Sequence, residues 1–341
     1  MEFQIPVNFP KSGKQITYRD KILLTGSCFT EHIGNTLEEL KFSVLQNPNG
    51  ILFDPISVCK SLVSYIRNKQ YTEDDLFELN EIWHSWQHHS HFSNLNKEEA
   101  LRIINESQQS AHEFLKEASW IIITLGSSFY YLLTKGAPKT TEASETSARG
   151  EDLGGVANCH RAPPQWFNKH LLEIDNIVSS LDNCYHQLIN FNPKLNIIFT
   201  VSPVRHIRDG VIDNNRSKAR LIEAVHSMVN KFDKLYYFPA YELVIDVLRD
   251  YRFYDIDMVH PNYIATEFVL EKFTETYMDK ESQQMMQEIK KIIIAKKHKP
   301  FQPETKAHQQ FLLSYFEKTK LFQEKYPFIN LKEELVYFSQ T

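Results

Sequence analysis

The string Ile22-Leu23-Leu24-Thr25-Gly26-Ser27-Cys28-Phe29 gives the strongest indication of the fold. Its first half is a short apolar run typical of a buried strand, and residues 29–40 have helical spacing. The turn between them therefore joins a strand to a helix. This turn also carries Ser27 and Cys28, two side chains that can serve as nucleophiles.

The same alternation continues along the chain. Further strands are predicted at residues 42–45, 120–125, 196–201 and 235–238, and helices at 56–68, 97–117, 166–191, 217–232, 240–250 and 263–278. This order predicts an α/β fold, a three-layer α/β/α arrangement with a mostly parallel sheet covered on both faces. Helical patterns at 285–299 and 308–325 predict a C-terminal extension. We therefore expect one domain over residues 1–280, with a helical extension over 281–341 packed on it.

Composition narrows the class of protein. The 341 residues are 42% hydrophobic, which supports a folded core, and the net charge of −5 shows no global basic footprint for nucleic acid. Without a signal-peptide pattern or an apolar run of membrane-spanning length, a cytoplasmic location is expected. The four cysteines include no CxxC pair, so free thiols are expected. No metal or cofactor is expected.

Two further kinds of string carry chemistry. In Asp257-Met258-Val259-His260, a carboxylate three residues before an imidazole can supply a base and the group that orients it. Gly126-Ser127-Ser128 and Ser202-Pro203 follow predicted strands directly. Because the carboxyl ends of parallel strands share one edge, these strings should meet the turn at Cys28. The helix after that turn is expected to lower the pKa of the Cys28 thiol.

Gly26-Ser27-Cys28-Phe29, followed downstream by Asp257-x-x-His260-Pro261, resembles the GSCFA family of the SGNH/GDSL-like hydrolase group. Thr30 stands where the family name has Ala. Similar strings lie at residues 47–51, 156–160, 202–206, 217–219 and 248–257, so the resemblance spans roughly residues 1–280. It implies an SGNH-like, flavodoxin-like fold. It also implies an esterase or acyltransferase acting on a small-molecule or carbohydrate-type acyl ester.

The resemblance also implies roles. Aligned on the glycine of the SGNH Gly-Asp-Ser string, Cys28 takes the nucleophile position and Ser27 the Asp position, so Cys28 is the first candidate nucleophile and Ser27 the second. The alternatives are a small buried thiol at Cys28 and a helix-capping hydroxyl at Ser27. His260 would be the base and Asp257 its orienter, against the alternative of a structural loop pair.

An oxyanion hole of the SGNH type uses a glycine after the second strand and the Asn of a Gly-x-Asn-Asp string. Gly50 is the candidate glycine. The string that starts at Gly126 lacks the Asn, so either Ser128 replaces this donor or Asn158 supplies it.

Other polar strings are candidates for substrate binding. Asn158-Cys159-His160 is either a binding loop or the anchor of the polar excursion at residues 135–155. Arg205 and His206 are candidates for holding an anionic or carbonyl group, and a helix-capping salt link is the alternative.

Residues 83–92 contain four histidines and two tryptophans. This stretch is interpreted as an aromatic pocket wall or a packed surface, and less readily as a metal site through His84, His88 and His91, because no acidic residue or cysteine joins them closely. Three functions therefore stay open: an ester hydrolase, a ligand-binding module on a degenerate SGNH fold, and a metal-dependent enzyme. The substrate and the oligomeric state are not predicted.

Overall fold

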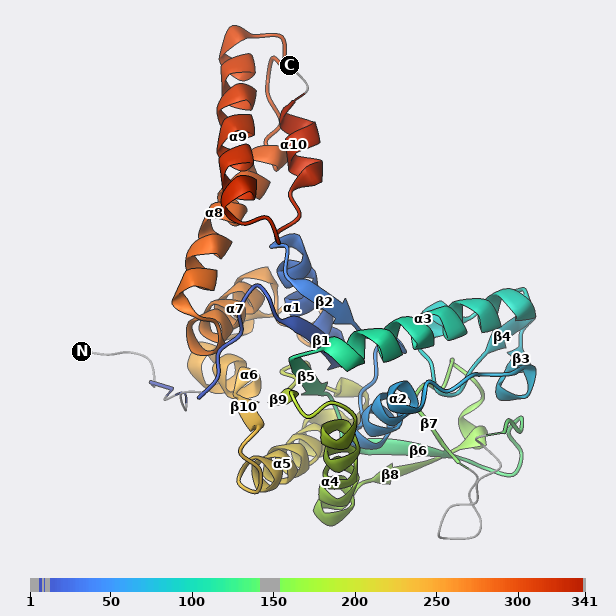
Figure 1. The fold of residues 1–341 in the computed structure, drawn as a ribbon. Coiled ribbons are helices and arrows are strands. Elements are labelled where there is room, and N and C mark those ends of the chain that lie inside the picture. Colours follow the sequence, from blue (N-terminus) through green and yellow to red (C-terminus); the bar gives the residue numbers. More distant parts are fainter. Residues whose placement is uncertain (1–5, 8, 10–12, 142–153, 340–341) are drawn as a thin grey trace.

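A five-stranded parallel sheet forms the centre of the molecule (Figure 1). The computed structural model describes all residues except 1–5, 8, 10–12, 142–153 and 340–341. The strand order is β2-β1-β5-β9-β10, with β1 at Lys21–Gly26, β2 at Ser43–Gln46, β5 at Trp120–Leu125, β9 at Asn196–Val201 and β10 at Leu235–Phe238. Within this sheet the order is the flavodoxin-like 2-1-3-4-5, which reverses direction between β1 and β5.

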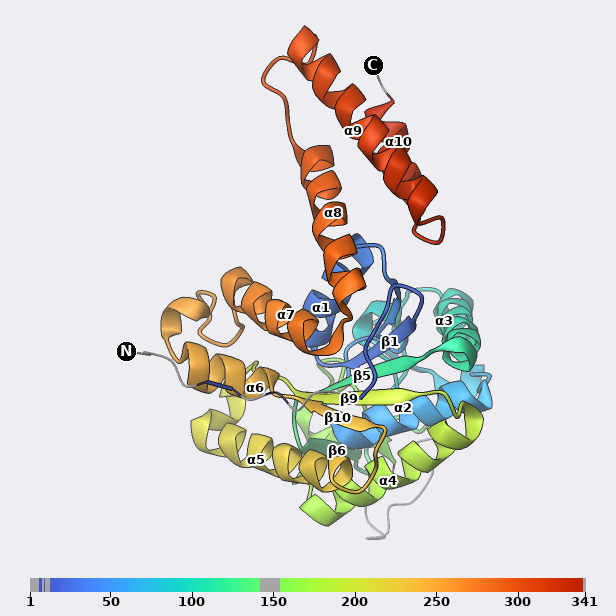
Figure 2. The ribbon, with the colours of Figure 1, turned by 60° about the vertical axis from the view of Figure 1, so that its left-hand side comes forward.

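Helices cover both faces of this sheet (Figures 1 and 2). Alternate side chains of β1 enter different cores: Ile22 and Leu24 pack toward one face and Leu23 toward the other. The first face is covered by α1 (Cys28–Glu39) and α7 (Tyr263–Tyr277), and the second by α2 (Pro55–Arg67), α3 (Lys97–Glu117), α4 (Ile174–Phe191) and α5 (Gly210–Val229). The predicted three-layer α/β fold is confirmed.

One predicted helix is wrong in its first part. Residues 166–191 do not form a single helix, because Phe167–Leu171 is strand β8 and α4 begins at Ile174. β8 pairs antiparallel with β6 (Phe129–Leu133), which also pairs with β7 (Gly155–Val156). Pairing with β6 satisfies the backbone of this segment, and Phe167 packs on the Trp86 cluster, so tertiary contacts override the apparent helical spacing.

Smaller elements complete the domain. A hairpin of β3 (Phe77–Leu79) and β4 (Ile82–His84) lies beside α3. The predicted helix at 240–250 is a short α6 (Ala240–Glu242) continued by a π-helix at Leu243–Leu248. Of the predicted excursion at 135–155, residues 142–153 lie outside the described residues.

Three C-terminal helices form an arm that projects from the sheet domain (Figures 1 and 2). They are α8 (Lys280–Lys297), α9 (Lys306–Lys325) and α10 (Lys332–Phe338), of which α10 was not predicted. Lys41 pairs with Glu334 at 3.0 Å and ties α10 to the end of α1. The domain boundary at residue 280 stays a prediction.

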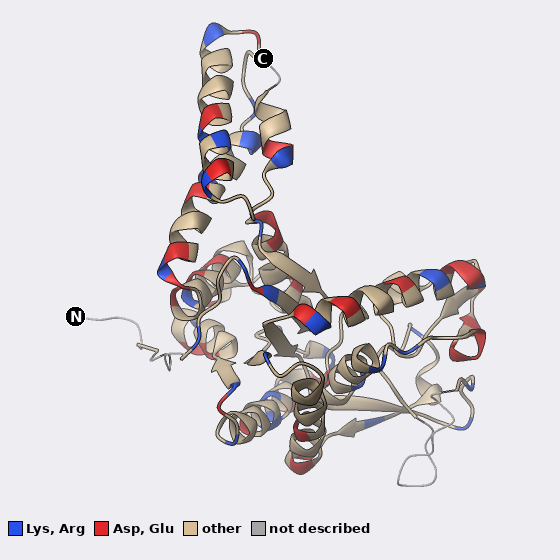
Figure 3. Cartoon of the chain, in the orientation of Figure 1, with Lys and Arg blue, Asp and Glu red and all other residues tan. Residues whose placement is uncertain are grey.

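Charges of both signs lie along the helices of the described chain (Figure 3). The basic segment near the end of α8 is paired with acidic neighbours, since Lys296 contacts Glu333 and Glu334 at 3.2 and 3.0 Å. No helix in the described ranges is long and apolar enough to span a membrane. The cytoplasmic location stays a prediction.

Candidate active site

The turn after β1 is held tightly against β5. Gly26 has a φ of 134°, and a Cβ at this position would lie 2.1 Å from the carbonyl oxygen of Thr124. Only glycine fits such a close approach. The Ser27 N–H then donates to the same carbonyl at 3.0 Å, and α1 begins at Cys28.

Ser27 and Cys28 face different surroundings. Ser27 is 1% exposed, and its Oγ finds no hydrogen-bond partner among the described residues. It occupies the N-cap position of α1 without forming a side-chain cap, so the predicted capping hydroxyl is wrong. Cys28, by contrast, lines a cavity at the carboxyl edge of the sheet. The fold therefore presents sulfur, and not the serine oxygen, to the cavity.

This cavity has a volume of about 530 Å³ and lies near the point where the strand order reverses. It is lined by five predicted site residues: Cys28, Asn158, Arg205, His206 and His260. Other predicted residues lie outside its lining: Ser27, Gly50, Gly126, Ser128, His160 and Asp257. A slightly larger cavity of about 590 Å³ lies between α2 and α4, away from the strand ends, and contains none of the predicted site residues.

Asp257 and His260 form a hydrogen-bonded pair. His260 Nδ1 lies 2.6 Å from Asp257 Oδ2, and Asp257 Oδ1 accepts the N–H groups of Val259 and His260 at 2.8 and 3.0 Å. These hydrogen bonds, the one from the imidazole first, lower the pKa of Asp257 to about 2. A carboxylate only accepts, so in the neutral imidazole Nδ1 carries the proton and Nε2 the lone pair. This is the tautomer a general base requires.

Arg205 clamps the loop that carries this pair. Its Nη1 donates to the Met258 carbonyl at 3.2 Å, and its main-chain N–H donates to the Val259 carbonyl at 3.3 Å. Its guanidinium lies 4.0 Å from the centre of the Tyr254 ring. Arg205 thus joins the segment after β9 to residues 257–260, a role that sequence reasoning did not predict.

The surroundings of Cys28 shift the pKa of its thiol in opposite directions. Burial raises the pKa of the Cys28 thiol and Glu31 raises it further, whereas Lys218 and the N–H groups of Cys28 and Phe29 lower it. The N–H groups at the start of α1 therefore lower the pKa of Cys28 as expected. The predicted net lowering of this pKa is nevertheless wrong, because desolvation of the sulfur outweighs their effect.

Most predicted oxyanion donors are already engaged. The N–H of Gly50 donates to Asn47 at 2.6 Å, that of Gly126 to Phe53 at 2.8 Å, and that of Ser128 to Ser217 Oγ at 2.8 Å. Gly50 lies in a tight turn, where its φ of 77° and the close contact with His89 favour glycine. The Ser128 hydroxyl also has an acceptor, the Ser217 carbonyl at 3.1 Å. The oxyanion roles of Gly50 and Ser128 stay predictions.

Asn158, unlike Gly50, Gly126 and Ser128, lines the cavity. Its Oδ1 accepts the His160 N–H at 2.8 Å, which leaves the Nδ2 amide as the donor of a cavity-lining side chain. Of the side chains predicted for this role, Asn158 is the one that lines the cavity.

The two histidines of the predicted binding strings have structural partners. His206 Nε2 donates to the Gly126 carbonyl at 2.9 Å, and burial, with Lys218 second, lowers the pKa of His206. His160 Nε2 donates to the Ser85 carbonyl at 2.7 Å, and burial lowers the pKa of His160 to about 4. His160 therefore belongs to the buried cluster behind Asn158 and lies outside the lining of the cavity, and its binding role stays a prediction.

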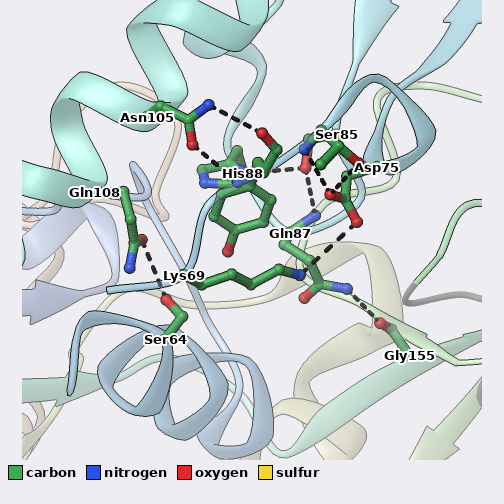
Figure 4. Close-up of polar contacts among 11 residues, drawn as sticks. Ser64, Lys69, Asp75, Ser85, Gln87, His88, Asn105, Gln108 and Gly155 are labelled. Carbon is green, nitrogen blue, oxygen red and sulfur yellow. Dashed lines mark hydrogen bonds and ion pairs between the residues drawn. The ribbon is translucent and has the colours of Figure 1, made fainter. Parts of the chain in front are cut away.

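Ser85, Gln87 and His88 lie inside the protein among polar contacts (Figure 4), whereas Ser90 and His91 of the same stretch are exposed. Trp86 is 1% exposed and stacks on Phe77 with ring centres 3.6 Å apart, and His88 Nδ1 shares a hydrogen bond with Ser85 at 2.8 Å. Burial lowers the pKa of His88 to about 3. None of these residues lines the cavity, so the pocket-wall interpretation is wrong and the packed-surface one fits. Among the described residues, no group of three or more His, Cys, Asp or Glu side chains is placed to hold a metal.

Sequence reasoning missed several residues of this region. Lys218 is 1% exposed and donates to the carbonyls of Gly126 and Ser202, each at 2.6 Å. Its position three and seven residues before Leu221 and Val225 placed it on the apolar face of α5, which was an available signal. Other missed cavity residues include Phe53, Asp54, Phe129, Tyr131, Arg208 and Asp209. Burial raises the pKa of Asp54 to about 6.

These features define an α/β protein with an Asp–His pair and a cysteine at the carboxyl edge of its sheet. The chain belongs to the GSCFA family: the GSCFA family model matches residues 21–273, and that of the GSCFA domain protein, C-terminal domain, matches residues 289–341. A search of curated proteins found no match.

Two solved structures are similar at low levels. A carbohydrate esterase family 3 protein from Talaromyces cellulolyticus shares 9% identity with a TM-score of 0.35, covering 80% of this chain and 99% of that one. An acetyl xylan esterase from the rumen bacterium Butyrivibrio proteoclasticus shares 12% identity with a TM-score of 0.34, covering 76% of this chain and 63% of that one. Values this low say nothing about activity or substrate.

Proposed function

We propose that this protein is an SGNH-like hydrolase that cleaves or transfers an ester-linked acyl group, with Cys28 as nucleophile, His260 as base and Asp257 as orienter. The observation that carries the proposal is the 2.6 Å hydrogen bond between Asp257 and His260 beside the cavity that Cys28 also lines. A nucleophile, a base and an orienting carboxylate are the parts that acyl transfer needs.

The reaction follows from these parts. His260 Nε2 takes the thiol proton while Cys28 Sγ bonds to the ester carbonyl carbon. The carbon–oxygen bond then breaks, and the leaving alcohol takes the proton from His260, so a thioester to Cys28 remains. In the second half, His260 removes a proton from water, and the resulting attack releases the carboxylic acid and restores the thiol. An alcohol in place of water gives acyl transfer.

The oxyanion of each tetrahedral intermediate needs donors within the cavity. The Asn158 amide and the N–H groups of Cys28 and Phe29 at the start of α1 are the donors we assign, since the N–H groups of Gly50, Gly126 and Ser128 are engaged elsewhere. The first N–H groups of a helix have no partner within it and suit an anion.

The residues that line the cavity support a substrate class. Phe53, Phe129 and Tyr131 present aromatic surface, and Arg205 and Arg208 add cationic groups. Such a mixture suits a small polar acyl ester such as an acylated sugar, whose apolar ring face packs on aromatic rings.

A panel of p-nitrophenyl esters and acetylated sugars tests this proposal with the wild type, Cys28→Ala, Ser27→Ala and His260→Ala. We expect His260→Ala to lower kcat/KM by roughly 10²- to 10⁴-fold and Cys28→Ala at least as much. Ser27→Ala is the matched control and should keep most of the activity, because its hydroxyl lies outside the cavity. Unchanged turnover in His260→Ala would contradict the mechanism.

A non-catalytic ligand-binding module is the second candidate function. The observation that favours it is the engagement of the Gly50, Gly126 and Ser128 N–H groups, together with the raised pKa of Cys28. This function predicts that Cys28 does not react with thiol- or acyl-directed probes at neutral pH. Covalent labelling of Cys28 by an activated ester, detected by mass spectrometry, would exclude it.

A further inference from the structure

Lys218 is a buried cation that the proposed mechanism does not use. Its ammonium is 1% exposed, and the two acceptors that hold it are main-chain carbonyls, those of Gly126 and Ser202, each at 2.6 Å. Carbonyl oxygens solvate a charge without neutralising it. Within the described part of the chain no carboxylate pairs with Lys218. A buried charge without a counter-ion is costly, and an anion formed beside Lys218 would reduce that cost.

The fold places this charge under the turn that carries Cys28. The two carbonyls stand where β5 and β9 end, and Gly126 packs on the turn after β1, since a Cβ at Gly126 would lie 3.2 Å from the Ser27 Cβ. Cys28 is the next residue along the chain. The influence is mutual, because Lys218 lowers the pKa of Cys28 and Cys28 raises that of Lys218. Burial outweighs the effect of Cys28 and brings the pKa of Lys218 down to about 7.

We propose that Lys218 is the counter-ion of the Cys28 thiolate. In each catalytic cycle the thiol proton goes to His260 Nε2, while Lys218 keeps its own proton and stabilises the charge left on sulfur. The role is one of positioning and electrostatics, since Lys218 is not among the cavity-lining residues. It rests on the proposed function in taking Cys28 as the nucleophile and His260 as the base.

Other charged and titratable groups also face this pair. Glu31 on α1 opposes the thiolate, and His206 after β9 is itself affected by Lys218. Asp54 before α2, Cys159 and His260 share the cavity with Cys28. Two charged side chains shift the pKa of Cys28: Glu31 raises it, and Lys218 lowers it and so favours the thiolate.

The pH dependence of Cys28 alkylation by iodoacetamide tests this role without any ester. Full-length protein carrying Cys159→Ser leaves Cys28 as the one thiol among the residues that line this cavity. Cys59 and Cys184 line the cavity between α2 and α4, so alkylation at Cys28 is followed by peptide mass spectrometry. Lys218→Met and Lys218→Gln remove the charge, Lys218→Arg keeps it, and Arg216→Met removes an exposed charge from the same helix as a control.

We expect the two neutral variants to raise the thiolate pKa by about one to three units, which slows alkylation at pH 7.5 at least roughly tenfold. Lys218→Arg should stay closer to the parent than either neutral variant, and Arg216→Met should match the parent. Profiles that coincide for the parent and a folded neutral variant would overturn the proposal. Lys218→Gln keeps an amide that can donate to the two carbonyls, so it carries the test if Lys218→Met does not fold.

Ester turnover in the same samples separates this inference from the proposed function. A Lys218-dependent thiolate pKa in a protein that cleaves no ester supports the ion pair and contradicts the hydrolase. Cys28-dependent turnover with a thiolate pKa that ignores Lys218 supports the hydrolase and contradicts the ion pair.

Discussion

The two sides of the cavity are built in opposite ways. The loop with Asp257 and His260 is open to solvent, with side chains 46% and 42% exposed, and its internal hydrogen bonds join residues at most a few positions apart. The turn with Cys28 is buried and held by Asn47, Leu52 and Thr124 from other segments. The Asp257–His260 pair is therefore joined by contacts within one short loop, which Arg205 holds from outside, whereas the turn has its geometry only within the finished sheet.

The largest effect should come from the buried side. Gly26→Ala puts a methyl group 2.1 Å from the Thr124 carbonyl at a φ of 134°, so we expect a loss of about 4 kcal/mol or more in the free energy of unfolding. Urea denaturation measures it. Gly13→Ala, where a Cβ meets nothing within 4 Å, is the control and should change stability little. A Gly26→Ala protein as stable as the wild type would show that the turn is not rigid.

The next effect falls on the exposed side. Asp257→Asn should lower ester turnover by roughly 10²- to 10⁴-fold, because an amide no longer fixes the His260 tautomer as a carboxylate does. With a pKa of about 2, Asp257 is charged at any ordinary assay pH. Its contribution to stability is therefore complete above about pH 4 and declines only as the pH falls toward 2.

Steady-state kinetics and a thermal melt at pH 7.5 check this prediction. Asp255→Asn, in the same loop, is the control and should keep its activity. Equal losses in both variants would mean that the loop tolerates no change, and the assigned role of Asp257 would fail.

A smaller effect should follow from loosening the clamp between the two sides. Arg205→Met removes the hydrogen bond to Met258 and the contact with Tyr254, so we expect kcat to fall about tenfold as His260 loses its fixed position. Arg208→Met, which removes another cavity-lining cation, is the comparison and should act mainly on KM. If both variants change only KM, Arg205 binds substrate and does not position the loop.

The smallest effect concerns the packed histidines behind Asn158. His88 stays neutral in the fold down to a pKa of about 3, whereas its ordinary pKa is 6.5. Between these two pH values His88 is protonated in the unfolded chain and neutral in the folded protein. The free energy of unfolding should therefore decline as the pH falls from about 6.5 toward 3. His88→Asn should flatten this decline in urea unfolding at pH 7, 6 and 5, whereas the exposed His32→Asn should leave it unchanged. An unaltered slope in His88→Asn would refute the assignment.

Features that depend on neighbouring residues could be predicted from the sequence, and features that depend on distant residues could not. The buried strands of the sheet and the Asp257–His260 pair each lie within a few consecutive residues, so periodicity or spacing predicted them. Strand β8 was not predicted, because its pairing with β6 depends on residues about 40 positions away. The engaged N–H of Ser128 and the buried site of Lys218 depend on contacts about 90 positions apart, which one sequence does not display.

The openness of the base has a consequence for the fate of a bound acyl group. His260 has 42% of its side chain exposed. As the proposed base, it would activate whichever hydroxyl diffuses to it from solution, while the acyl carbon stays bonded to Cys28. In the proposed mechanism, the ratio of free acid to new ester is then a kinetic partition set by acceptor concentration. Added alcohol should divert acyl groups from water without slowing their formation on Cys28, so one protein can be an esterase in dilute solution and an acyltransferase in a sugar-rich one.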